Sequence, residues 1–280
     1  MMNKLIVKAP AKINIGLNIV AKRKDGFHDL ETIFYPIYDL YDEIKFENSN
    51  SFIFQNDYEF ENIIVKAVRL LERHTGCKIK IKISLEKNIP IGAGLGGGSS
   101  DAAAVLGTLN KILKLNLRYE ELSNIALEIG SDVPYFLVNK PSVGKSRGED
   151  LTPIDLSIDS YILLVNPGIH ISTKEAFSNI TPMPNEFDYH SITKINLKNY
   201  NKYILNDFEQ SIFHKHPHIR KIKDDLYSSG ALFSSMSGTG STVYGIFQTK
   251  MEAENALKSF PENYFTFISH PIKPNELSNL

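Results

Sequence analysis

A glycine-rich segment at residues 90–100 is the part of the chain whose composition points most directly to chemistry. It reads Pro90, Ile91, Gly92, Ala93, Gly94, Leu95, Gly96, Gly97, Gly98, Ser99 and Ser100. Glycine costs conformational entropy, so such a run is kept where the backbone must turn sharply or approach a ligand closely. Apolar residues at helical spacing follow it, and the N–H groups that open a helix attract anions. The segment therefore predicts a triphosphate site at a helix start, with Ser99 or Ser100 as the N-cap and Asp101 in the first turn.

Two known glycine patterns fit this loop poorly. The P-loop pattern requires a Gly-Lys-Ser/Thr sequence after the glycines, and no lysine stands there. Gly92, Gly94 and Gly97 match the loose G-x-G-x-x-G dinucleotide pattern, but that pattern belongs to a βαβ unit with an acidic strand end. Here the upstream elements look antiparallel, and Tyr119 begins a helix instead. A loop that is merely flexible and binds nothing remains the structural alternative.

Three polar residues outside the loop suit phosphoryl transfer. Lys12 and Asn14 lie two apart in an alternating stretch, so they share one face of a strand. A lysine there can offset the charge that develops on a transferring phosphoryl group, although a lysine on a strand is often only a solvated side chain. Asp132 follows a helix end and precedes Val133 and Pro134, which suits either a base that accepts a hydroxyl proton or a simple loop aspartate.

A second loop of small residues occurs at residues 237–241, between two expected strands. It contains Gly238 and Thr239, and by itself it is typical of a hairpin turn. Two glycine loops in one chain favour a ligand site that both loops line. His214, His216 and His218 alternate as in a metal-binding tract, but no cysteine or acidic partner is near, so we expect no metal site.

The overall composition restricts the class of protein. The chain has 280 residues, 31 basic and 32 acidic side chains, and a formal charge of −1, which argues against a nucleic-acid partner. Cys77 is the single cysteine, so no intrachain disulfide forms and a reducing compartment fits best. The first residues lack a signal-peptide pattern, and the apolar runs are too short to span a membrane. We expect a cytoplasmic protein with no membrane association.

The elements that would position these residues follow from apolar periodicity and from turn signals. They form an α+β mixture rather than a regular βαβα series. The expected strands are residues 5–20, 32–40, 42–46, 79–85, 161–165, 231–235, 243–247 and 265–272. The expected helices are residues 59–75, 119–129, 217–229 and 250–258. One more helix is expected directly after the glycine loop. Residues 131–134 and 141–153 read as turn-rich loops, and residues 179–201 as irregular. A domain boundary is expected near Asp155.

The chain resembles the GHMP small-molecule kinases, which include galactokinase, homoserine kinase and mevalonate kinase. The glycine loop followed by Asp101-Ala102-Ala103 is similar to the central motif of that family. Further motifs agree and occur in family order: Ala9-Pro10-Ala11-Lys12-Ile13-Asn14, Asp25-Gly26-Phe27-His28, Gly130-Ser131-Asp132-Val133-Pro134, Asn206-Asp207-Phe208-Glu209 and Ser237-Gly238-Thr239-Gly240. The resemblance covers most of the chain.

The resemblance implies a fold and an activity. The fold would be the two-domain GHMP kinase fold, with a ribosomal S5 domain 2-like N-terminal ATP-binding domain over residues 1–155 and a ferredoxin-like C-terminal domain over residues 156–280. The triple glycine and Ser-Ser pair are closest to the member of the non-mevalonate isoprenoid route. That member uses ATP with Mg²⁺ to phosphorylate the 2-hydroxyl of 4-diphosphocytidyl-2-C-methyl-D-erythritol.

The resemblance also implies roles for single residues. Residues 90–100 would bind ATP, Asp132 would act as the base, and Lys12 would be its catalytic partner. Substrate contacts would come from Asn14 at the hydroxyl, His28 at the cytosine edge, Phe27 and Phe177 at the cytosine faces, and from Thr173, Gly238 and Thr239. The family often has Tyr where this chain has Phe27, so stacking is kept and a hydroxyl contact is lost.

Two alternatives remain open at this stage. One is another GHMP kinase that acts on homoserine or on a mevalonate-type substrate. The motif with Phe27 and His28 argues against it, because those substrates contain no cytosine for these residues to recognise. The other is a nucleotide-binding protein without catalysis, against which Lys12 and Asp132 both argue. We expect a small-molecule substrate and a monomer or weak homodimer.

Overall fold

The computed structural model describes residues 4–55, 63–178 and 180–271. Spatial contacts divide the chain into two compact units whose segments interleave along the sequence. The first unit comprises Met1–Ala11, Leu40–Ile91 and Gly96–Asn139, and the second comprises Lys12–Asp39, Gly92–Leu95 and Lys140–Leu280. Two long strands, β1 (Leu5–Lys22) and β2 (His28–Asn48), contribute residues to both units. Within the described ranges, none of the helices has the length and apolarity that crossing a bilayer requires.

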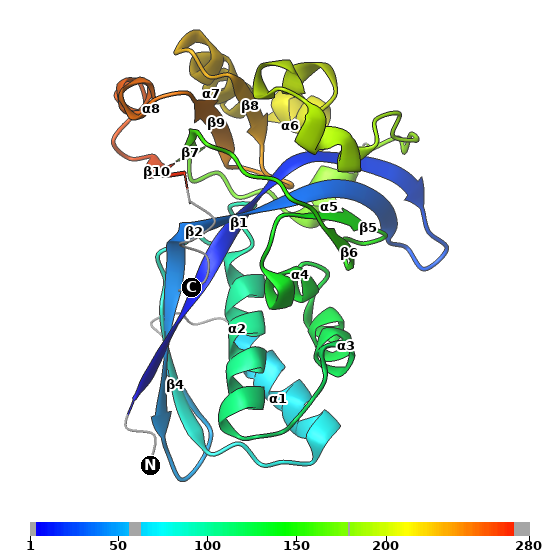
Figure 1. Cartoon of the computed structure of the whole chain (residues 1–280), viewed down its shortest axis with the longest axis vertical. Helices are drawn as coiled ribbons and strands as arrows, with labels where there is room; N and C mark the ends of the chain where they lie inside the picture. Colours follow the sequence, from blue (N-terminus) through cyan, green and yellow to red (C-terminus); the bar gives the residue numbers. More distant parts are fainter. Residues whose placement is uncertain (1–3, 56–62, 179, 272–280) are drawn as a thin grey trace. The chain divides into compact units, whose positions relative to one another are not determined.

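The described part of the first unit combines a small sheet with four helices (Figure 1). Strand β4 (Ile81–Glu86) pairs antiparallel with the end of β2 and parallel with β3 (Ile53–Gln55). The helices are α1 (Ile63–Thr75), α2 (Gly97–Ile112), α3 (Tyr119–Ile129) and α4 (Val133–Val138). Helix α2 packs against each of the other three, as α3 also does. Its buried stripe includes Ala102, Val105, Leu106 and Leu109, so the apolar spacing fixes which face turns inward.

The second unit is built on an antiparallel sheet of order β10-β7-β9-β8. Its strands are β7 (Tyr161–Asn166), β8 (Phe233–Met236), β9 (Val243–Phe247) and β10 (Phe265–Ser269). Helix α7 (Pro217–Ser228) packs on β8 and β9, and α8 (Lys250–Leu257) on β7 and β9 (Figure 1). Helix α6 (Phe208–Lys215) in turn packs against α7. Buried side chains of these elements form one apolar core, which also includes Leu17 and Ile19 from β1.

Shorter elements complete the second unit. A hairpin of β5 (Ser142–Lys145) and β6 (Asp150–Pro153) joins β2, where Thr32 pairs with Gly144. Helix α5 (Thr173–Phe177) packs against α6. Two 3₁₀ helices, η1 (Tyr189–Lys194) and η2 (Leu197–Lys202), follow it.

Most predicted elements are confirmed, and the differences have local causes. The two strands predicted at residues 32–40 and 42–46 are one strand, β2, because Tyr41 continues the extended backbone. The predicted loop at residues 141–153 is the β5–β6 hairpin, and the predicted loop at 131–134 already enters α4 at Val133. Part of the irregular stretch is 3₁₀ helix, and helices α5 and α6 were not predicted. Of the helix predicted at 59–75, residues 59–62 lie outside the described residues.

Candidate active site

Lys12 and Asn14 form a buried polar pair on strand β1. The Lys12 amino group donates a 2.6 Å hydrogen bond to Oδ1 of Asn14 and a 3.3 Å bond to the carbonyl oxygen of Gly94. Asn14 in turn donates to the hydroxyl of Thr32 at 2.9 Å. Only 3% of Lys12 and 2% of Asn14 are exposed to solvent, so this lysine is not a solvated surface charge. The prediction that the two side chains share one face is confirmed.

The two glycine loops touch each other within the second unit. A Cβ atom on Gly94 would overlap the carbonyl oxygen of Ser237 and lie 2.9 Å from that of Gly240. The Ser237 hydroxyl donates to the carbonyl oxygen of Gly94 at 2.8 Å, and the backbone N–H of Thr242 donates to Ala93 at 3.2 Å. Gly94 has a φ of +77°, in the region that favours glycine. The two glycine loops thus pack against each other at residues 92–95, and a ligand site lined by both stays a prediction.

Gly238 lies against the head groups of the buried pair. A Cβ atom on Gly238 would be 3.2 Å from Oδ1 of Asn14 and 3.7 Å from the amino nitrogen of Lys12. The backbone N–H of Asn14 also donates to the Ser237 hydroxyl at 3.2 Å. Residues 12–14, 92–95 and 237–240 therefore meet in one cluster of backbone amides and polar side chains.

The remaining part of the glycine loop opens helix α2 in the first unit. Gly96 is the N-cap, with a φ of 72°, and no side chain caps this end. The predictions that Ser99 or Ser100 is the N-cap and that Asp101 lies in the first turn are therefore wrong. The helix begins three or four residues earlier, because glycine adopts the left-handed conformation of Gly96 without the steric cost that serine carries. Gly98 is exposed, and the first N–H groups of a helix have no intrahelical partner, so this helix start suits an anion.

A buried ionic cluster lies beneath that helix start. Lys87 bonds to Asp42 and, at 2.9 Å, to Asp101, and both carboxylates are almost fully buried. Burial raises the pKa of Asp101 to about 7, with Asp42 adding to the rise and Lys87 opposing it. Burial alone would lower the pKa of Lys87, but the two carboxylates raise it above its usual range. A Cβ atom on Gly97 would be 3.2 Å from the Lys87 amino nitrogen, so the cluster adjoins the loop. Sequence reasoning missed it, because its members come from three separate segments.

Asp132 lies in the first unit, immediately before α4. It is half-buried, and it is the residue at which the chain turns from Gly130 into the short helix. The backbone N–H of Val133 donates to Gly130 at 3.2 Å and closes this turn, and Pro134 stands in the first turn of α4. The catalytic role of Asp132 stays a prediction.

The residues predicted to bind cytosine make two separate ring contacts in the second unit. The rings of His28 and Phe177 stack with centroids 4.7 Å apart, and Phe177 packs edge-on against Phe208. Phe27 instead has the guanidinium of Arg147 over its ring at 3.8 Å. Burial, and to a lesser extent the charge of Lys22, lowers the pKa of His28. Sequence reasoning missed Arg147, which belongs to the β5–β6 turn.

Two further residues border these sites. Thr173 is exposed and begins α5, whose N-cap Ser172 accepts a hydrogen bond from the backbone N–H of Glu175. His170 was not predicted. A Cβ atom on Gly92 would be 2.9 Å from Nδ1 of its imidazole, so His170 lies beside the first glycine of the loop.

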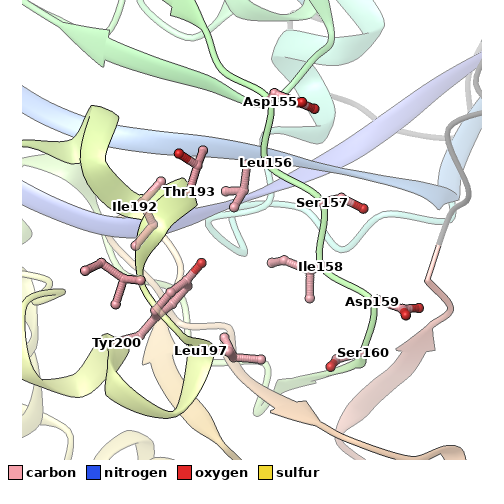
Figure 2. A pocket seen from close by; sticks show the side chains of 11 residues that line it. Asp155, Leu156, Ser157, Ile158, Asp159, Ser160, Ile192, Thr193, Leu197 and Tyr200 are labelled. Carbon is pink, nitrogen blue, oxygen red and sulfur yellow. The ribbon is translucent and has the colours of Figure 1, made fainter.

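A separate cavity of about 380 Å³ lies between residues 155–160 and the two 3₁₀ helices. Figure 2 shows Leu156 and Ile158 pointing toward Ile192 and Tyr200, whereas Ser157 and Asp159 point away. None of the residues that line this cavity is basic or belongs to the predicted site. The cavity therefore does not suit a phosphate-bearing ligand.

Comparison with known proteins identifies relatives over nearly the whole chain. The GHMP kinases N terminal domain matches residues 62–140, and the GHMP kinases C terminal domain matches residues 188–266. The 4-diphosphocytidyl-2-C-methyl-D-erythritol kinase of Azobacteroides pseudotrichonymphae is 46% identical over 250 residues, which cover 85% of this chain and 91% of the relative. A crystal structure of 4-(cytidine 5'-diphospho)-2C-methyl-D-erythritol kinase superposes with a TM-score of 0.79 at 30% identity, covering 94% of this chain and 98% of that one. Homoserine kinase from Cytophaga hutchinsonii shares the fold, with a TM-score of 0.71 at 16% identity, over 97% and 96% of the two chains.

Proposed function

The chain belongs to the 4-diphosphocytidyl-2-C-methyl-D-erythritol kinases of the GHMP family, and we propose that Lys12 and Asp132 are its catalytic residues. The enzyme uses ATP to phosphorylate the 2-hydroxyl of 4-diphosphocytidyl-2-C-methyl-D-erythritol in isoprenoid biosynthesis. The α+β two-domain fold that the resemblance implied is the fold of this chain. The division of roles among residues is the part that we propose.

The observation that carries the role of Lys12 is its burial among groups that orient it. Asn14 and the carbonyl oxygen of Gly94 accept hydrogen bonds from its amino group. A cation that is fixed and shielded from water interacts more strongly with developing phosphoryl charge than a solvated one. We propose that Lys12 stabilises the γ-phosphoryl group during transfer, and that Asn14 contacts the acceptor hydroxyl.

ATP binding would depend on main-chain amides. The loop has no P-loop lysine, so we propose that N–H groups of residues 92–100 hold the phosphates, aided by the positive end of the α2 dipole. Among the described residues, no three His, Cys, Asp or Glu side chains come together as a metal site. Mg²⁺ commonly takes most of its ligands from substrate phosphates and water, so we propose that it binds as the ATP complex. When bound, it neutralises part of the phosphate charge.

Asp132 would act as the base. In the proposed step, its carboxylate accepts the proton of the 2-hydroxyl, and the hydroxyl oxygen forms a bond to the γ-phosphorus. The bond from that phosphorus to the bridging oxygen of ADP breaks, and ADP leaves with the electron pair. The protein contributes mainly position and charge in such a transfer.

The second unit would recognise the cytidine. We propose that His28 reads the cytosine edge, that Phe27 and Phe177 flank the base, and that Thr173 contacts the same moiety. Gly238 and Thr239 would contact the substrate from the second loop. Aromatic faces suit this role because base stacking contributes about 1–3 kcal/mol per ring. We further propose that the enzyme works in the cytoplasm as a monomer or weak homodimer.

An acceptor panel tests the assigned activity directly. Purified enzyme with ATP and Mg²⁺ is offered 4-diphosphocytidyl-2-C-methyl-D-erythritol, homoserine or mevalonate in parallel, and ADP release is followed. We expect ADP only with the first acceptor and a product phosphorylated at its 2-position by ³¹P NMR. Transfer to another acceptor, or ATP binding without turnover, would overturn the assignment.

Asp132→Asn should lose nearly all turnover and keep nucleotide affinity, and near-normal kcat would remove Asp132 from the mechanism.

A further inference from the structure

The segment Asn206-Asp207-Phe208-Glu209 contacts the second glycine loop through hydrogen bonds. The proposed chemistry gives this segment no role. The side-chain amide of Asn206 donates to two carbonyl oxygens, those of Met236 and Gly238, each at 2.8 Å. Its own Oδ1 accepts from the backbone N–H of Phe208 at 3.0 Å. Only 4% of Asn206 is exposed, so both of its donors are committed inside the protein.

The two acidic residues of the segment fix the neighbouring strands. Glu209 accepts from the backbone N–H of Met236 at 2.8 Å and from the Ser235 hydroxyl at 3.0 Å. Asp207 accepts from the backbone N–H of Ile19 at 2.7 Å on strand β1. The segment therefore holds β8, the start of the loop and the strand that carries Lys12.

The loop that Asn206 holds is the one that contacts the buried pair. Gly238 has a φ of +56° and lies against Asn14 and Lys12, while Ser237 bonds to both Asn14 and Gly94. A shift of the Gly238 carbonyl would move these contacts together, since close-packed groups transmit small displacements.

We propose that Asn206 is a positioning residue for phosphoryl transfer, which sets the Gly238 backbone against Lys12 and Asn14 through its two amide hydrogen bonds. It does not touch the reacting atoms. The inference rests on the proposed function, since it assigns Asn206 a part in aligning the residues that carry the reaction.

Asn206→Ala and the milder Asn206→Ser test this inference by steady-state kinetics. Misplacement by about 1 Å can cost about 100-fold in rate, so we expect Asn206→Ala to lower kcat by roughly that factor. Asn206→Ser keeps one hydroxyl donor and should fall between Asn206→Ala and the wild type. The KM for ATP should change by less than about 3-fold, because the proposed phosphate contacts at the start of α2, residues 96–99, do not involve Asn206.

Asn110→Ala is the matched control. Asn110 donates to the carbonyl oxygen of Leu117 and accepts from its backbone N–H, both at 3.0 Å, in the first unit. We expect it to lower Tm as the Asn206 variants do and to leave kcat unchanged. If Asn206→Ala and Asn206→Ser lose thermal stability but keep wild-type kcat, Asn206 is only structural.

The double variant Asn206→Ala/Gly238→Ala asks whether the effect passes through the loop. If it does, the double variant should lose little more kcat than Gly238→Ala alone, because both changes displace the same backbone. Fully additive losses would overturn the inference. Absence of transfer by the wild-type enzyme would instead refute the proposed function, so the two failures are distinguishable.

Discussion

Replacing Asp101 with asparagine should change how the stability of the enzyme depends on pH. The residue is 1% exposed, and the pKa of its carboxyl group rises from an ordinary 3.8 to about 7. Between these values the folded protein keeps the proton, whereas the unfolded chain has released it. The contribution of this group to the free energy of unfolding is therefore largest below pH 4, and it is lost as the pH rises through 7.

The magnitude follows from the two pKa values. One pKa unit corresponds to about 1.4 kcal/mol, so the interval from 3.8 to about 7 amounts to about 4 kcal/mol. An asparagine side chain cannot titrate, so Asp101→Asn should lack this loss. The free energy of unfolding of Asp101→Asn minus that of the wild type should rise by about 4 kcal/mol between pH 4 and pH 8. Any constant cost of burying the amide cancels in this difference.

Urea unfolding of both proteins across that pH range is the assay, with Asp159→Asn as a control. Asp159 is an exposed carboxylate, so the control removes the same charge without the burial. ¹³C NMR of labelled aspartate carboxyls gives the titration of Asp101 directly. A difference that stays constant within about 1 kcal/mol would refute the reasoning, as would a carboxyl that titrates near its ordinary value.

Three further predictions concern the site. Gly94→Ala places a Cβ atom against the second loop at a positive φ, so we expect at least about 2 kcal/mol of destabilisation and a lower kcat. The control is Gly107→Ala, where the Cβ atom would enter open space on α2. Urea unfolding should show this control to be neutral or stabilising. Phe177→Ala removes the ring that stacks on His28, so the KM for the cytidine substrate should rise about 10-fold with the KM for ATP unchanged, and equal changes in both would contradict this. Lys12→Ala should lower kcat/KM by about 1,000-fold or more, and a loss under 10-fold would exclude a role in transfer.

Local sequence determined those features that depend on near neighbours in the chain. Lys12 and Asn14 share a face because strand side chains alternate, and the alternation is visible in the sequence. The glycine loop predicted a helix start, because apolar residues at helical spacing follow the glycines directly. Family motifs supplied the activity, and the comparisons confirmed it.

Tertiary structure alone decided which distant groups meet. No periodicity links Lys87 to Asp42 and Asp101, or Asn206 to Gly238, because these contacts depend on how separate elements pack. Alternation and helical spacing express local backbone geometry, whereas burial and hydrogen bonding between remote segments come from the packing of the whole chain.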